Sequence, residues 1–89
     1  MKINRTKTFK KSFNKLKLND SEFQNFVEVI YYLCNKKKLP LKYKDHQLKG
    51  ELKDFRECHI KPDLLLIYRK KSDILELIDI GSHSELFKG

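Results

Sequence analysis

The first part of the chain combines a short polar stretch with apolar residues at helical spacing. Positions 2–8 (KINRTKT) are polar and tolerant of β structure, which predicts a first strand. Phe9, Phe13 and Leu16 follow at i, i+4 and i+7, the spacing of residues on one face of a helix. We therefore expect a strand followed by a short helix.

A second, longer helix is predicted downstream. The stretch SEFQ has the form of a capping box, with Ser21 as N-cap and Gln24 as its partner. The lysines at 36–38 suit a helix C-terminus, and Pro40 ends the pattern. The apolar residues that follow helical spacing here are Phe23, Phe26, Val27, Ile30, Tyr31, Leu33 and Cys34.

After Pro40 the hydrophobic period changes to two, which is typical of strands. Gly50, the pair 62–63 and the triplet 71–73 carry turn-forming residues. The stretches between the turns predict strands at 51–61, 64–70 and 74–80. The run LLLIY makes the middle one a buried central strand, and the short connections require antiparallel neighbours.

This order of elements predicts an α+β fold, β-α-α-β-β-β. Two helices are expected to pack on one face of a curved antiparallel sheet, which leaves the other face free to be polar and to bind. The chain has 89 residues, enough for one domain and too few for two. We therefore expect a single domain that covers residues 1–89.

The charge balance favours a polyanionic partner. Twenty Lys and Arg residues against twelve Asp and Glu give a formal net charge of +8. Nucleic acid, an acidic protein and an anionic membrane all fit such a charge. No apolar run approaches the roughly 20 residues of a spanning helix, and the start of the chain has no apolar signal segment. We expect a cytoplasmic protein that does not use a membrane.

The two cysteines do not indicate a metal site. Cys34 and Cys58 form no CxxC pair and no repeated ligand spacing, so both are predicted to be buried thiols. Zinc would need more ligands at better spacing. We expect neither a metal nor another cofactor.

Alternation along 55–61 separates two faces of one strand. Cys58 and Ile60 suit the core beneath the helices, so Glu57 and His59 should lie on the open face. Arg56 shares the core side under this prediction. It must therefore extend toward solvent, or a bulge must shift the register.

The three histidines suggest a chemistry. Each alone is more often a surface group, but His46, His59 and His83 all lie on or beside the predicted open face. RNA cleavage needs a base for the ribose 2′-OH, an acid for the departing 5′-oxygen and cations for the phosphate. Phe87 is predicted either to fill a core edge or to stack on a base.

Three segments resemble a known family. YKDHQLKG (43–50), FRECHIKPDLLLIY (55–68) and GSHSELF (81–87) are similar to the matching segments of YafQ-type toxins, in the RelE/ParE superfamily of bacterial type II toxin–antitoxin systems. The resemblance covers nearly the whole chain. It implies a RelE-like fold and an endoribonuclease that cleaves mRNA, free or on the ribosome, and halts translation. It also implies a cognate antitoxin, for which the net charge predicts an acidic binding segment, and contact with operator DNA only through the antitoxin complex.

The same resemblance implies the site. His83 is expected as the acid, with His59 or Glu57 as the base. His46 and Asp63 would position the phosphate or the histidines. Phe87 would orient a base by stacking, whereas Leu64 stands where the namesake of the family has tryptophan.

Basic residues surround these motifs. They can form a groove for the RNA backbone or serve only as solubility charge, and the net charge favours the groove. The predicted RNA-binding residues are Lys44, Lys49, Lys53, Arg56 and Lys61.

Two other functions stay open. One is a non-catalytic superfamily member that inhibits a protein target such as gyrase, although that branch lacks the histidine set. The other is a plain RNA-binding module, whose binding would depend on lysines and survive loss of the histidines. A shared fold does not decide among these functions.

Overall fold

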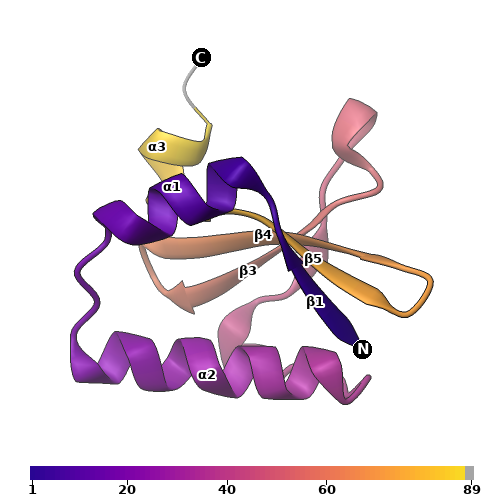
Figure 1. The fold of residues 1–89 in the computed structure, drawn as a ribbon, viewed down its shortest axis with the longest axis horizontal. Helices are drawn as coiled ribbons and strands as arrows, with labels where there is room; N and C mark the ends of the chain where they lie inside the picture. The colour runs from indigo at the N-terminus through magenta and orange to yellow at the C-terminus, as the bar shows by residue number, and fades with distance from the viewer. Residues whose placement is uncertain (88–89) are drawn as a thin grey trace.

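The computed structural model describes residues 1–87 and shows an α+β fold (Figure 1). The predicted order of strand, two helices and meander is present, with a very short strand and a C-terminal helical turn in addition. In chain order the elements are β1 (Lys2–Arg5), α1 (Lys7–Lys15), α2 (Asp20–Cys34), the 3-10 turn η1 (Leu41–Tyr43), β2 (His46–Gln47), the 3-10 turn η2 (Gly50–Leu52), β3 (Arg56–Lys61), β4 (Leu64–Lys71), β5 (Ile74–Gly81) and α3 (His83–Leu86).

The sheet has five strands in the order β1-β5-β4-β3-β2. The pairs β2–β3, β3–β4 and β4–β5 are antiparallel, as the short connections required. β1 pairs with β5 in parallel, so the sheet is mixed rather than wholly antiparallel. A parallel pair needs a long connection, and the chain between β1 and β5 contains every other strand.

Two helix starts differ from the sequence prediction. Thr6 caps α1, because its side chain accepts from the Phe9 amide and donates to the Ile78 carbonyl, so β1 stops at Arg5 instead of continuing to residue 8. The capping box of α2 is formed by Asn19 and Glu22, not by Ser21 and Gln24. Ser21 lies inside the first turn, where its hydroxyl accepts from Lys61. The helix ends at Cys34, six residues before Pro40.

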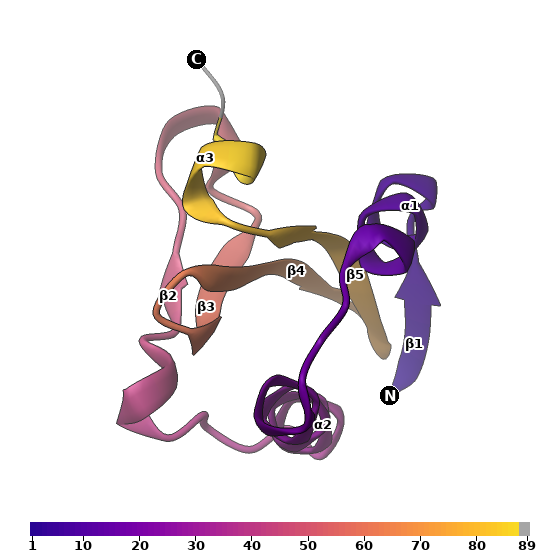
Figure 2. The same cartoon turned by 90° about the vertical axis from the view of Figure 1, so that its left-hand side faces the viewer.

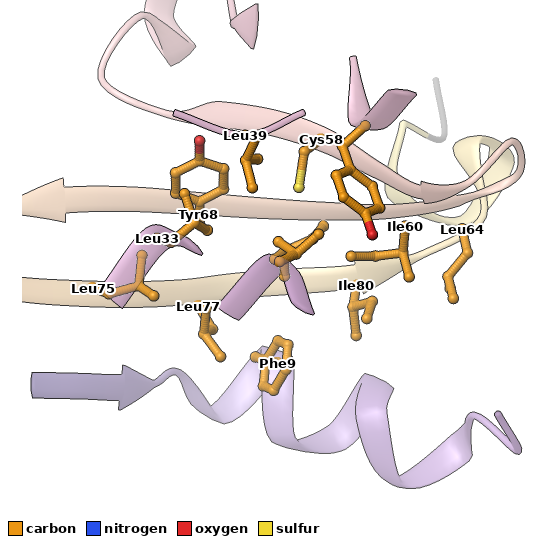
Figure 3. Packing of buried hydrophobic residues seen from close by; sticks show 13 residues of the cluster. Phe9, Leu33, Leu39, Cys58, Ile60, Leu64, Tyr68, Leu75, Leu77 and Ile80 are labelled. Carbon is orange, nitrogen blue, oxygen red and sulfur yellow. The ribbon is translucent and has the colours of Figure 1, made fainter. Parts of the chain in front are cut away.

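Both helices contribute to one core, as predicted. Figure 2 shows α2 lying across one face of the twisted sheet and α1 lying beside β1 and β5. Phe9 of α1 stacks on Phe13 and lies 6.4 Å from Phe26 of α2 between ring centroids. Figure 3 shows how the buried side chains of both helices and three strands meet between these layers.

The alternation along β3 follows the prediction. Cys58 and Ile60 belong to the core, whereas Glu57 and His59 contact each other on the opposite face. Arg56 stays on the core side at the sheet edge and keeps 38% of its side chain exposed, so its head group reaches toward solvent. The register shift in β3 lies between His59 and Lys61 and does not move Arg56.

The apolar residues of α2 divide between two environments. Val29 and Leu33 are buried under the sheet, and Cys34 is only partly buried, contrary to the prediction. A second row is exposed to about half of its full area: Phe23 (53%), Val27 (49%) and Tyr31 (53%). Within residues 1–87, no helix has both the length and the apolar character needed to cross a membrane.

Candidate active site

Glu57 and two histidines form the centre of the candidate site. One carboxylate oxygen of Glu57, Oε1, lies 3.3 Å from His59 Nε2 and 3.7 Å from His46 Nε2. The two imidazole ring centroids are 6.4 Å apart. Glu57 is only 6% exposed, because the rings cover it, whereas the His46 side chain keeps 51% of its area open. The predicted face of Glu57 is confirmed, but its predicted exposure is wrong.

Strand pairing brings His46 to this position. In β2, His46 is the direct partner of Glu57, and this strand has only two residues. His46 Nδ1 lies 2.9 Å from the Lys44 carbonyl oxygen. That contact fits an Nδ1–H donor, which directs Nε2 toward the Glu57 carboxylate.

His83 reaches the same end of the sheet from the last strand. His59 and Gly81 both pair with Leu65, so β4 separates them by two strand spacings, about 10 Å. His83 follows Gly81 by two residues and begins α3, which Ser82 caps. Its backbone amide donates to Asp63 Oδ1 at 3.2 Å, so the turn between β3 and β4 holds the start of α3.

Phe87 lies beside His83. The two ring centroids are 5.1 Å apart, with an interplanar angle of 41°. Phe87 is partly buried and lines a hollow of about 300 Å³ with Leu86 and Ile67 on the face that carries Glu57. Its ring is therefore available both to support His83 and to meet a flat ligand.

The predicted basic residues do not form one cluster. Lys44 and Lys61 border the same hollow of about 290 Å³ as His59, together with Lys42. Lys49 and Lys53 are exposed on either side of η2, on the segment between β2 and β3. Arg56 instead forms a two-point ion pair with Asp45, at 3.3 Å and 3.0 Å.

The cysteines and acidic residues do not suggest another centre. Cys58 is fully buried, and burial raises the pKa of its thiol well above the usual range. Across residues 1–87, no group of three or more His, Cys, Asp or Glu side chains is arranged to hold a metal ion.

Comparison with known sequences identifies the family. A family model described as the YafQ toxin of bacterial type II toxin–antitoxin systems matches residues 1–88. This chain belongs to the YafQ toxin family. The resemblance that the three motifs indicated is thereby confirmed.

Similar proteins are found among curated YafQ toxins. The mRNA interferase toxin YafQ of Escherichia coli is 43% identical over 49 residues, which cover 55% of this chain and 53% of that protein. The putative toxin YafQ of Haemophilus influenzae is 39% identical over 64 residues, 67% of this chain and 63% of that protein. The chain thus spans less than two thirds of the length of each of these relatives.

Solved structures agree with the YafQ assignment over almost the whole chain. A copper-bound mutant toxin from Helicobacter pylori gives a TM-score of 0.87 at 49% identity, covering 97% of this chain and 98% of that one. The Escherichia coli DinJ–YafQ complex gives 0.82 at 30% identity, covering 96% of each chain. The predicted RelE-like α+β fold is confirmed.

Sequence reasoning missed three residues around this YafQ-type site. Asp45 and Tyr68 share a hydrogen bond beneath the strand that carries His46, and Lys42 borders the hollow beside His59. Lys42 could have been predicted from the sequence, because it belongs to the same lysine-rich stretch as Lys44. Asp45 and Tyr68 were not, because they are 23 residues apart and meet only when β2 joins β3 and β4.

Proposed function

We propose that this chain is an endoribonuclease that cleaves mRNA without a metal ion, inhibits translation in the cytoplasm and is neutralised by a cognate antitoxin. The observation that carries the proposal is the position of Glu57 Oε1 between two imidazole nitrogens, one of which belongs to His59 beside a lysine-bordered hollow. Imidazole and carboxylate groups transfer protons near neutral pH. The name mRNA interferase toxin of the Escherichia coli relative describes the same reaction class.

The proposed reaction needs two proton transfers. His59 or Glu57 takes the proton of the ribose 2′-OH, whose oxygen attacks the adjacent phosphorus. The bond from phosphorus to the 5′-oxygen then breaks, and His83 gives that oxygen a proton. Because His59 and His83 reach the site from strands on either side of β4, they are suited to act on opposite sides of one phosphate.

Other residues position the reacting groups. Asp63 accepts a hydrogen bond from the backbone amide of His83. This bond supports the predicted role of Asp63, which is to hold the proposed acid in place. The His46 imidazole lies beside Glu57, and about half of its side chain is exposed. The exposed part of the ring can contact the phosphate. Phe87 presents its ring next to His83, which supports stacking on a base of the bound RNA.

Lysines are proposed to guide the RNA backbone. Lys42, Lys44 and Lys61 border the hollow next to His59, which adds Lys42 to the predicted set. Lys49 and Lys53 would continue the path along the segment around η2. Phosphate binding by such lysines depends strongly on salt.

The first test is cleavage of mRNA by the purified protein in EDTA, with and without ribosomes. Wild type should cut, and His59→Ala and His83→Ala should each lower the single-turnover rate by about 10²-fold or more. Lys37→Ala, an exposed change three residues beyond the end of α2, serves as the control and should cut normally.

Folded wild-type protein that cuts no RNA in either condition would contradict the proposal. Retained RNA binding would then favour a plain binding module. Inhibition of gyrase would favour a protein-targeted toxin. The comparison with and without ribosomes also decides which form of the mRNA is the substrate.

The antitoxin is proposed to cover the exposed part of α2. Relatives have been solved as a DinJ–YafQ toxin–antitoxin complex. In this chain Phe23 borders a groove of about 400 Å³ between β1, α1 and α2, and Arg5 lies on the rim of that groove. An amphipathic segment with acidic residues would match the apolar surface and the net charge of +8. Operator DNA would be contacted only through this complex.

A further inference from the structure

Asp45 is held by two residues on the core side of the sheet. Arg56 donates to both carboxylate oxygens, Nε to Oδ1 at 3.3 Å and Nη2 to Oδ2 at 3.0 Å. The Tyr68 hydroxyl donates to Oδ1 at 2.5 Å. Arg56 and Tyr68 are direct partners across β3 and β4, so strand pairing places the two donors side by side.

Burial makes this arrangement specific. Tyr68 is fully buried, and burial together with Asp45 raises the pKa of its hydroxyl, so it remains a donor at neutral pH. The bond to Asp45 raises the pKa of Arg56. Figure 3 shows the Tyr68 ring among core side chains, with its hydroxyl at the edge of the cluster. A buried hydroxyl and a paired charge lose more when their partner is removed than exposed groups do.

The anchor lies one residue before His46. Consecutive side chains of an extended chain point to opposite faces, so fixing Asp45 on the core side turns His46 to the face of Glu57. The strand that carries His46 has only two residues, and Lys44 before it has a positive φ of 47°. So short a strand has few ladder hydrogen bonds of its own to set the position of the imidazole.

We infer that Asp45, clamped by Arg56 and Tyr68, is a positioning residue that fixes the His46 imidazole over Glu57 for RNA cleavage. The inference rests on the proposed function and gives Arg56 an indirect role in place of the predicted contact with RNA. Asp45 and Tyr68 act through the backbone of the strand that carries His46 and do not touch the substrate.

A double-mutant cycle tests this role. Tyr68→Phe keeps the ring and removes only the hydroxyl donor. It should lower the single-turnover cleavage rate about tenfold or more, with RNA affinity unchanged. In a His46→Ala background the same change should have less than about a twofold effect, because there is no imidazole left to position. Equal losses in both backgrounds would show a general structural role and overturn the inference.

Arg56→Lys separates the clamp from phosphate binding. Lysine keeps the positive charge but cannot make the two-point contact with a carboxylate. The clamp predicts a lower cleavage rate at normal RNA affinity. A wild-type rate, or a loss confined to RNA affinity, would overturn the inference. Circular dichroism checks that each variant is folded.

NMR of the imidazole nitrogens keeps the test independent of activity. In Tyr68→Phe the signals of His46 should shift, while those of His83 serve as the internal control. If wild type fails to cleave but the His46 signals shift while those of His83 do not, the proposed function fails and the clamp stands. Unchanged His46 signals would overturn the clamp itself.

Discussion

Glu57 ties the two imidazoles of the site together. Among residues 1–87 it is the one charged side chain that is buried, and a buried carboxylate needs polar partners. His46 and His59 share its Oε1 atom from two different strands. A change at either histidine therefore also alters the carboxylate that the other one contacts, and single substitutions here should not combine additively.

Asp63 allows a residue-level test of positioning against charge. Asp63→Ala should lower the cleavage rate, because the His83 amide loses its acceptor. Asp63→Asn keeps an oxygen acceptor and should retain most of the activity if that bond is the important feature. Single-turnover cleavage rates of the two variants show whether the hydrogen bond or the charge of Asp63 is needed. An Asn variant as slow as the Ala variant would show that the carboxylate charge acts directly.

At the scale of elements, the start of α2 gives a matched pair of substitutions. Asn19→Ala removes the side chain that caps the helix and should lower the free energy of unfolding by about 1 kcal/mol. Ser21→Ala removes a hydroxyl inside the first turn, whose exposed bond to Lys61 should contribute about 0.5 kcal/mol or less. Urea denaturation measures both. A larger loss of stability in Ser21→Ala than in Asn19→Ala would show that Ser21, not Asn19, caps the helix.

The elements also show what the sequence could predict. Periodicity identified α1, α2 and the three long strands, because each buries one face against the core. It could not choose between two overlapping capping boxes with the same spacing, at Asn19 and at Ser21. It also placed Val27 on the apolar face and left Val29 out, whereas the structure buries Val29 and leaves Val27 49% exposed. The capping box of α3, Ser82 with Glu85, was present in the sequence and could have been found.

The candidate site was predicted unevenly for a related reason. Alternation placed Glu57 and His59 on the correct face, because it is a local property of one strand. The approach of His46 depends on a two-residue strand, too short for any periodic signal. The support of His83 by Asp63 joins residues 20 positions apart, and only the sheet register reveals such a contact.

The exposed row on α2 gives a prediction about the antitoxin. Val27→Glu places a carboxylate in the middle of the row and should weaken neutralisation by an acidic antitoxin segment at least about tenfold. RNA cleavage by the variant alone should be unchanged. Leu41→Glu, at an apolar residue that is 87% exposed, is the control. Titration of cleavage with purified antitoxin is the measurement, and equal neutralisation of both variants would exclude this surface.

The whole molecule carries the charge of +8, and its distribution can be tested by salt. If Lys44, Lys49, Lys53 and Lys61 each neutralise one phosphate, raising monovalent salt from about 50 to 200 mM should weaken single-stranded RNA binding about fiftyfold. Replacing these four by Gln should remove most of that dependence. A control with the same change in net charge replaces the four exposed lysines of α1, Lys7, Lys10, Lys11 and Lys15.

Fluorescence anisotropy with labelled RNA measures both quadruple variants. A similar loss of affinity and of salt dependence in the two would mean that only the overall charge matters. The proposed groove instead requires the variant of Lys44, Lys49, Lys53 and Lys61 to lose far more RNA affinity and salt dependence than the variant on α1.

The parallel pairing of β1 with β5 links the assembly of the fold to the order in which the chain is synthesised. Thr6 and Ile78, which share a hydrogen bond, are 72 residues apart. A chain that leaves the ribosome N-terminus first therefore exposes β1 without its neighbour until Ile74–Gly81 has emerged, and His83 follows later. A chain that still lacks β5 also lacks His83, so for a protein with the proposed activity we expect the partner of β1 and the proposed acid to be added together, at the end of synthesis.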